Sequence, residues 1–197
     1  MSKFENAKAE IVSEKTLADQ WTRLSTFEVD YTDSRGEKHR LKREVYHRTP
    51  AACILLYDPS HETVVLVRQH RLPSQLVGLP ERMIEVPAGL LDRDDPEAAI
   101  RREAMEETGF RVRDVRFLFK SMTSPGSSTE VIYFFAAVID TSDRVANGGG
   151  LAEEHEDIEV LEVRLSDAIV MMEKGDIYDA KTIMLLQWAA LNVASLR

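Results

Sequence analysis

Alternating apolar and polar residues near the start of the chain predict a β-hairpin. From Thr22 to Thr32 the two kinds of residue roughly alternate, as in a strand with one covered face. Residues 33–36, Asp-Ser-Arg-Gly, supply a turn, and residues 39–48 read as the returning strand. We therefore expect a hairpin region over residues 1–48 and a larger domain over residues 49–197.

The remaining pattern mixes strands with helices. Dense apolar runs, separated by a turn that contains Pro59, predict two core strands, and later runs predict three more strands and two terminal helices. Because the elements do not alternate regularly, we expect a mixed-sheet α/β fold rather than a doubly wound one. The expected strands are 52–57, 63–69, 112–119, 131–139 and 158–164, and the expected terminal helices are 166–174 and 180–194.

One further helix has clear start and stop signals. It is predicted over residues 96–108, with Pro96 in the first turn, Asp94 and Asp95 as candidate caps, and Gly109 as the end. By contrast, residues 142–156 are rich in glycine and acids and predict a long mobile loop.

Composition narrows the class of protein. The 197 residues carry 34 acids against 25 bases, a formal net charge of −9, which argues against a surface for nucleic acid. No apolar run is long enough to span a membrane, and the N-terminus has no apolar signal segment. The single cysteine, Cys53, lies in an apolar run and fits a buried thiol in a reducing compartment. We therefore expect a cytoplasmic globular protein without a membrane or nucleic-acid partner.

Three glutamates crowd one side of the predicted helix. At roughly 100° per residue, Glu103 and Glu107 lie about 40° apart, and Glu106 lies one turn from Glu103. Like charges at this spacing disfavour a helix unless a cation neutralises them, and oxygen ligands suit Mg²⁺. The alternative is a solvated acidic face with Arg101 and Arg102 as ordinary ion-pair partners.

The residues around these glutamates resemble the signature of the Nudix hydrolase family. That signature consists of a glycine, a spacer with an acid, and then R-E-U-x-E-E-x-G-U, where U is apolar. Residues 102–110, Arg-Glu-Ala-Met-Glu-Glu-Thr-Gly-Phe, match every specified position. Gly89 and Arg102 enclose twelve residues where the family has thirteen, which puts Asp94 in the place of the first acid.

This resemblance implies an α/β/α sandwich that hydrolyses a nucleoside diphosphate linked to another group, with Mg²⁺ or Mn²⁺. Cations between the phosphate oxygens and the protein would remove the repulsion that an attacking water meets. Arg102 would orient the glutamates by a charge-assisted hydrogen bond. The implied metal ligands are the Ala88 carbonyl, Glu103, Glu106 and Glu107.

Other segments resemble the ADP-ribose and nucleotide-sugar branch of the family, and point within it to GDP-mannose. They are residues 42–46, 67–71, 124–130, 144–150 and 179–182. The branch implies hydrolysis to GMP and mannose 1-phosphate by a homodimer that exchanges its N-terminal hairpins. The residues carried over as substrate contacts are Trp21, Lys42, Arg43, Glu44, Arg71, Gly89, Leu90, Glu130 and Lys181.

Several of these assignments have competing interpretations. Trp21 would stack on the base but could equally be a core residue of the hairpin, and Arg71 and Lys181 could form surface ion pairs instead of contacting phosphate. The branch also uses a glutamate outside the signature as metal ligand or base. The run 153–157 offers Glu156, chosen by its position before Asp157-Ile-Glu-Val, with Glu154 as the alternative.

Two other functions compete with hydrolysis of GDP-mannose. ADP-ribose hydrolysis would use the same metal site. A catalytically silent nucleotide-sugar sensor would be expected to lack signature acids, yet Glu103, Glu106 and Glu107 are all present. Decapping or editing of nucleic acid ranks last, because the chain lacks a basic, aromatic-rich groove.

Overall fold

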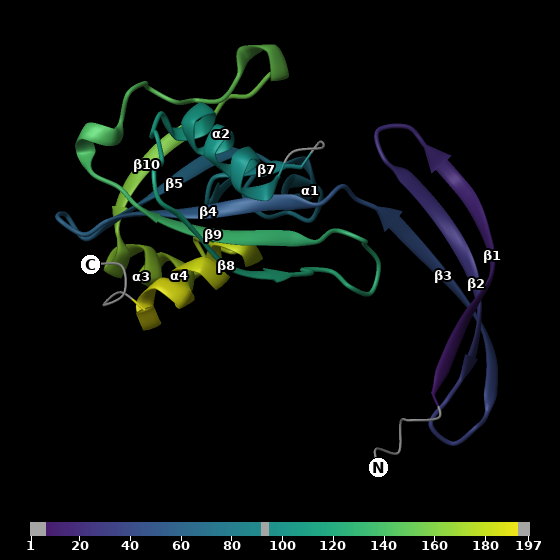
Figure 1. Ribbon diagram of the computed structural model, residues 1–197. Helices are drawn as coiled ribbons and strands as arrows, with labels where there is room; N and C mark the ends of the chain where they lie inside the picture. Colours follow the sequence, from purple (N-terminus) through teal and green to yellow (C-terminus); the bar gives the residue numbers. More distant parts are fainter. Residues whose placement is uncertain (1–6, 92–94, 193–197) are drawn as a thin grey trace. The chain divides into compact units, whose positions relative to one another are not determined.

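The structure, a computed structural model, describes residues 7–91 and 95–192, which form two units (Figure 1). The N-terminal unit contains residues up to Thr49 together with Ser124–Glu130, and the larger unit contains Pro50–Thr123 and the residues from Val131 onward. Asp94, expected to replace the first signature acid, lies outside the described residues.

The N-terminal unit is a three-stranded antiparallel sheet in the order β1-β2-β3, so it contains the predicted hairpin and one further strand that was not expected. Strands β2 (Arg23–Thr32) and β3 (Lys38–His47) are the predicted pair. The missed strand is β1 (Lys8–Asp19), which pairs with β2 and contains two register shifts. All twelve of its residues are exposed, so it has no covered face to impose the alternation that sequence reasoning detects.

The larger unit contains a seven-stranded sheet, which is mixed as the sequence predicted and has two strands more than the five expected. The main strand order is β10-β5-β4-β9-β8, with β6 paired to β5 and β7 paired to β4. Strands β4 and β9 are parallel, and the other pairs are antiparallel. The strands are β4 (Ala51–Asp58), β5 (Thr63–His70), β6 (Arg82–Glu85), β7 (Ala88–Leu90), β8 (Val115–Ser121), β9 (Ile132–Val138) and β10 (Glu159–Arg164).

Helices cover both faces of this sheet, which explains why β4 is apolar at every position before its last. Its residues alternate between two cores: Cys53, Leu55 and Tyr57 pack with α3 (Leu165–Lys174) and α4 (Ala180–Asn192). Ala52, Ile54 and Leu56 pack with α2 (Pro96–Thr108). Figure 1 shows the two helical layers on opposite sides of the strands. Cys53 is fully buried, as expected, and burial raises the pKa of its thiol well above the ordinary range.

The ends of α2 are fixed by local sequence. Asp95 accepts hydrogen bonds from the backbone N–H groups of Glu97 and Ala98, Pro96 begins the helix, and Gly109 ends it at a φ of 78°. The structure thus selects Asp95 as the cap of the predicted helix. These caps set which helix positions face the sheet and which face the site.

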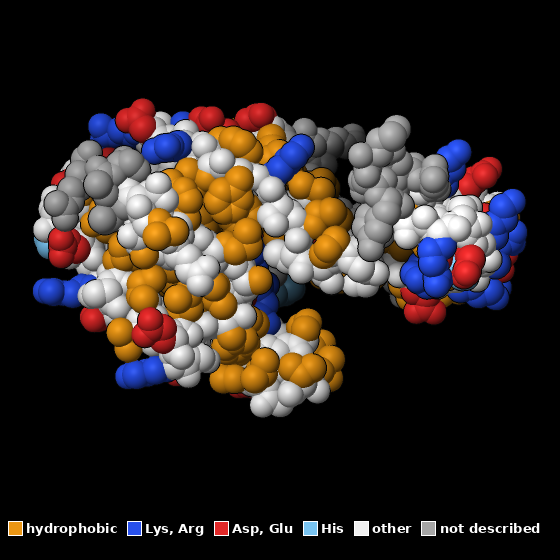
Figure 2. Space-filling view, turned by 90° about the horizontal axis from the view of Figure 1, so that it is seen from below, with side chains coloured by type: hydrophobic (Ala, Val, Ile, Leu, Met, Phe, Trp, Pro, Cys, Tyr) orange, Lys and Arg blue, Asp and Glu red, His pale blue; other side chains and the backbone are white. Residues whose placement is uncertain are grey.

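A few short elements were not predicted. They are α1 (Leu72–Leu76) and the 3₁₀ turns η1 (Thr141–Asp143) and η2 (Ala152–Glu154), besides strands β6 and β7. None of the helices within residues 7–91 and 95–192 is long and apolar enough to span a membrane. In Figure 2, hydrophobic side chains gather over the larger unit, whereas acidic and basic side chains dominate the view of the N-terminal unit.

Candidate functional site

The site is built around Glu107, a carboxylate buried at the end of α2. Its side chain is 2% exposed and accepts a hydrogen bond of 3.1 Å from the backbone N–H of Ala88. Burial raises the pKa of Glu107 to about 8, because the Ala88 N–H and Arg71 offset only part of the desolvation and Glu103 and Glu156 add repulsion. A divalent cation bound here would displace this proton and neutralise the buried carboxylate.

Glu103 lies one turn earlier and packs directly on the backbone of Gly89. A Cβ built on Gly89 would lie 2.1 Å from Cδ of Glu103, so only glycine permits this approach. Burial raises the pKa of Glu103 to about 7, although Arg102 lowers it. The Arg102 Nη1 lies 3.1 Å from Glu103 Oε1 and 3.2 Å from Glu106 Oε2, so it bridges two of the predicted ligands.

The loop after β9, within the segment 142–156 that was expected to be a long mobile loop, is joined to α2 by backbone hydrogen bonds. Gly149 donates its N–H to the carbonyl of Glu107, and Gly150 donates to the carbonyl of Glu106. These bonds satisfy two of the carbonyls that a helix leaves without intrahelical partners at its C-terminus. A Cβ on Gly148 would lie 2.5 Å from the Glu107 carbonyl oxygen, which explains the glycine at this contact.

This anchored loop brings Glu156 to the buried glutamates. Glu156 Oε2 accepts a 2.9 Å hydrogen bond from the backbone N–H of Leu151, and its charge raises the pKa of both Glu103 and Glu107. Glu154, the alternative, is exposed on η2, and its charge acts on Glu103. Glu156 is therefore the better placed of the two loop acids.

Arg71 and Lys181 belong to a partly buried ion network. Arg71 donates two hydrogen bonds, of 2.7 and 2.9 Å, to the buried carboxylate of Glu85. Lys181 lies 3.7 Å from the same carboxylate and donates to Asp179 at 2.7 Å. The expected alternative of a surface ion pair does not describe them, since Glu85 is 2% exposed.

The other predicted substrate residues lie in the N-terminal unit, except Leu90, which ends β7. Trp21 is 79% exposed, so it is not a core residue, and the Arg48 guanidinium lies 5.0 Å from its ring centroid. Arg48 also contacts Glu130, at 3.3 Å. Strand β3 carries Lys42, Arg43 and Glu44, all three of which are exposed.

Two other features of the N-terminal unit are not sites of this kind. The first is a possible metal-binding cluster. Among the residues that the structure describes, Asp33, Glu37 and His39 are the one set whose potential metal-ligand atoms lie within 4.8 Å of one another. Arg35 already pairs with Asp33 and Glu37. Burial raises the pKa of Asp33, but the hydrogen bonds that Asp33 accepts from Glu37 and Arg35 hold this pKa at about 2. These contacts close the β2–β3 turn.

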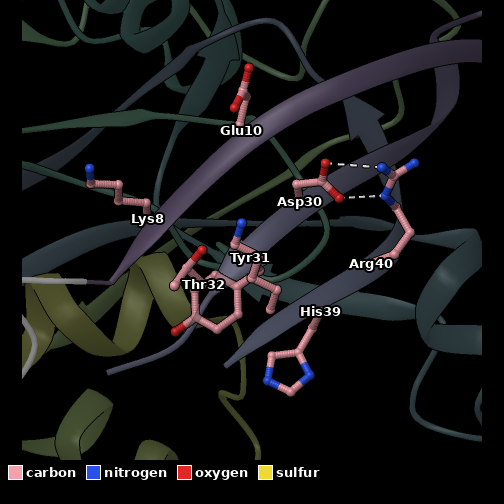
Figure 3. Close-up of a pocket in the computed structure, with 8 residues that line it drawn as sticks. Lys8, Glu10, Asp30, Tyr31, Thr32, His39 and Arg40 are labelled. Carbon is pink, nitrogen blue, oxygen red and sulfur yellow. Dashed lines mark hydrogen bonds and ion pairs between the residues drawn. The ribbon is translucent and has the colours of Figure 1, made fainter. Parts of the chain in front are cut away.

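A shallow pocket also lies on this sheet (Figure 3). In Figure 3, Asp30 and Arg40 face each other, joined by the two hydrogen bonds that Arg40 donates to both carboxylate oxygens. Their charges cancel, and none of the predicted substrate residues lines the pocket.

Sequence reasoning missed the roles of Glu85, Asp179 and Arg48. The first two lie in segments that resemble the family, but nothing in their spacing shows that they pair with Arg71 and Lys181. Glu85 is 14 residues from Arg71 and 96 from Lys181, so only the fold brings the three charges together.

Known proteins match both units. Residues 47–186 match the family described as NUDIX domain, and residues 8–46 match the one described as GDP-mannose pyrophosphatase NudK N-terminal domain. A protein of Enterobacter sp. (strain 638) named GDP-mannose pyrophosphatase is 45% identical over 186 residues, covering 94% of this chain and 96% of that protein. One of the same name from Escherichia coli O1:K1 / APEC is 46% identical, covering 92% and 95%.

Solved structures share the fold. The structure titled "Crystal structure of ADP compounds hydrolase" matches with a TM-score of 0.69 and 20% sequence identity, covering 93% of this chain and 95% of that one. At this identity the match supports the fold alone.

The raised pKa of Glu107 predicts how stability depends on pH. Between the ordinary pKa of 4.5 and about 8 the folded chain keeps a proton that the unfolded chain releases, so stability should fall as pH rises through this window. We expect E107Q to remove this loss. In EDTA, the Tm of the parent should fall relative to that of E107Q as the pH is raised from 5 to 8. The expected fall is about 2–4 °C for each kcal/mol lost from the free energy of unfolding.

A matched control is E97Q, which removes a carboxylate with a half-exposed side chain from the same helix. It should follow the parent's pH curve. Mg²⁺ added at pH 8 should raise the Tm of the parent and of E97Q but not that of E107Q. Parallel pH curves for parent and E107Q would show that Glu107 does not carry the effect.

Proposed function

The chain belongs to the Nudix family, and from that membership we propose that it hydrolyses GDP-mannose to GMP and mannose 1-phosphate. The observation that carries the proposal is similarity at about 46% identity along more than nine-tenths of the chain to proteins named for this activity. The similarity includes the N-terminal unit, which matches a domain named for the same enzyme. The reaction adds one water across the diphosphate.

We assign the metal site to the Ala88 carbonyl and to Glu103, Glu106, Glu107 and Glu156. The donor set is all oxygen, which suits Mg²⁺ or Mn²⁺. When bound, such cations neutralise the diphosphate oxygens and acidify a water. The crowding that raises the pKa of Glu103 and Glu107 supports the assignment, because a cation would relieve it.

Within this site Arg102, Glu107 and Glu156 have separate tasks. Arg102 holds Glu103 and Glu106 in place through its two contacts. Glu107 is held in place by the hydrogen bond from the Ala88 N–H and is too deeply buried to contact substrate. Glu156 is only partly buried, and since Leu151 holds one of its oxygens, the other can take the proton of the attacking water.

The substrate contacts are assigned by chemistry. Gly89 and Leu90 offer backbone beside Glu103, and Arg71 and Lys181 offer positive charge to phosphate. An exposed indole such as Trp21 can stack on a purine. Lys42, Arg43, Glu44 and Glu130 supply polar groups for the nucleotide and the sugar.

We further propose that the protein is a homodimer formed through its N-terminal unit, with each unit contributing contacts to the partner's site. The support is the exposed strand β1, on which Ile11 is 68% exposed and Val12 and Leu17 are each 46% exposed. Apolar side chains at a sheet edge favour association with another chain.

The activity is tested by turnover with Mg²⁺ on two substrates side by side. We expect kcat/KM for GDP-mannose to exceed that for ADP-ribose at least tenfold, and EDTA to stop the reaction. Equal or greater activity on ADP-ribose would overturn the substrate, and unchanged activity in EDTA would overturn the metal requirement.

The loop acid is tested by paired substitutions. E156Q should reduce kcat on GDP-mannose by about 10²–10⁴-fold, the range for loss of a general base, whereas E154Q should stay within twofold of the parent. Thermal unfolding of both variants serves as the control for folding. A reversed order would assign the role to Glu154.

The dimer is tested by light scattering. The parent should have twice the 22.4 kDa chain mass, and I11E should shift it toward the monomer. The matched control L191E also places a charge at an exposed leucine, 86% exposed on α4, and should stay dimeric. A monomeric parent would contradict the proposal.

A further inference from the structure

Four charged side chains behind the site form an alternating chain from α4 to β5. Asp179 contacts Lys181, Lys181 contacts Glu85, and Glu85 contacts Arg71, at 2.7, 3.7 and 2.7 Å. Two positive and two negative groups give the chain no net charge. The two carboxylates therefore offset the repulsion between Arg71 and Lys181. Both cations can then be held in this part of the fold before an anion binds.

Glu85 uses only part of the guanidinium of Arg71. It accepts from Nε and Nη2, the side edge of the planar group, through both carboxylate oxygens. The end edge, formed by Nη1 and Nη2, faces away from Glu85 because the guanidinium is rigid and flat. No hydrogen bond from Nη1 to another described residue is among the contacts of Arg71, and 40% of its side chain is exposed, so the guanidinium has donor capacity left for a second anion.

Asp179 has two tasks, one on each of its oxygens. Oδ2 caps α4 by accepting from the backbone N–H and the hydroxyl of Thr182, at 2.9 and 2.8 Å. Oδ1 accepts from Lys181 Nζ. Thr182 in turn accepts a 2.8 Å hydrogen bond from the N–H of Val86, next to Glu85, so the start of α4 is fixed to the end of β6.

The network lies close enough to the metal site to act on it. Arg71 and Glu107 influence each other electrostatically, and Glu85 precedes Ala88 by three residues. Burial alone would lower the pKa of Lys181, but Asp179 and Glu85 keep it above its ordinary value. Both cations thus remain charged at neutral pH.

We propose that Glu85 and Asp179 are positioning residues, which hold Arg71 and Lys181 as a preformed pair of cations for the phosphates of the nucleoside diphosphate sugar. The inference rests on the proposed function for the identity of the substrate. Neither carboxylate touches the substrate. Each acts by fixing a cation whose long side chain would otherwise lose rotamer freedom on binding.

The test compares E85Q with E97Q. Glu97 also accepts two hydrogen bonds from an arginine, Arg101, but its side chain is 46% exposed and lies in the first turn of α2, so it controls for the loss of one such pair. We expect E85Q to raise KM for GDP-mannose about tenfold while kcat and the Mg²⁺ activation constant stay within threefold, and E97Q to change none of them. E85D, which keeps the charge, should recover part of the loss.

D179N separates the ion pair from the helix cap. Asparagine is as good an N-cap as aspartate, so α4 stays capped while Lys181 loses the nearer of its two ion-pair partners and keeps Glu85. KM should rise as in E85Q with little change in Tm. D179N also decides the question if E85Q does not fold. The proposal is overturned if KM in D179N and any folded E85Q equals that of E97Q, or if KM and the Mg²⁺ constant rise in parallel.

A binding measurement tests the positioning role of Glu85 separately from the proposed hydrolysis of GDP-mannose. Calorimetric titration with GDP and Mg²⁺ should show about tenfold weaker binding to E85Q than to the parent or E97Q. If the parent binds GDP but does not hydrolyse GDP-mannose, the proposed function fails while the weaker binding still supports the cation pair. Equal affinities of parent and E85Q would overturn the positioning role.

Discussion

The structure of the site depends on the burial of a carboxyl group at the C-terminal end of α2. A carboxylate that is 2% exposed is costly unless neighbouring groups compensate it, and the C-terminal end of a helix adds further negative potential. The surrounding elements compensate for this desolvation cost. Ala88 donates its N–H to Glu107, Arg71 supplies positive charge nearby, and the pKa of Glu107 rises so that the proton is retained.

The same constraint explains the glycines of the site. Carboxylates can gather here only if backbone approaches them closely, and a Cβ on Gly89 or Gly150 would overlap the side chain of Glu103 or Glu156. Gly148 lies against the last turn of α2, at a φ of 70°. The N–H groups that follow it bind the final carbonyls of the helix. Helix end, loop and loop acid are therefore one structural unit.

Charge is handled differently on the two sides of Glu107. Toward the loop, Arg102 bridges Glu103 and Glu106 at the surface of α2. Toward α4, the chain of ion pairs from Asp179 to Arg71 carries no net charge and places the Arg71 guanidinium near Glu107. Under the proposed function, a protein with a net charge of −9 would bind a polyanion through cations held by its acids and through Arg71 and Lys181, which are already paired with carboxylates.

Sequence alone determined what depends on local pattern. The caps of α2, the spacing of Glu103, Glu106 and Glu107, and the apolar strands β4, β5 and β9 follow from periodicity and from residue chemistry within a few positions. Tertiary structure decided what depends on distant segments. It added the exposed strand β1, joined residues 149–150 to α2 by hydrogen bonds, left Glu154 exposed while partly burying Glu156, and paired Glu85 with both Arg71 and Lys181. The reason is physical. A hydrophobic period or a helix cap depends on neighbouring residues, whereas desolvation and ion pairing depend on which segments, distant in the sequence, the fold brings within a few ångströms of one another.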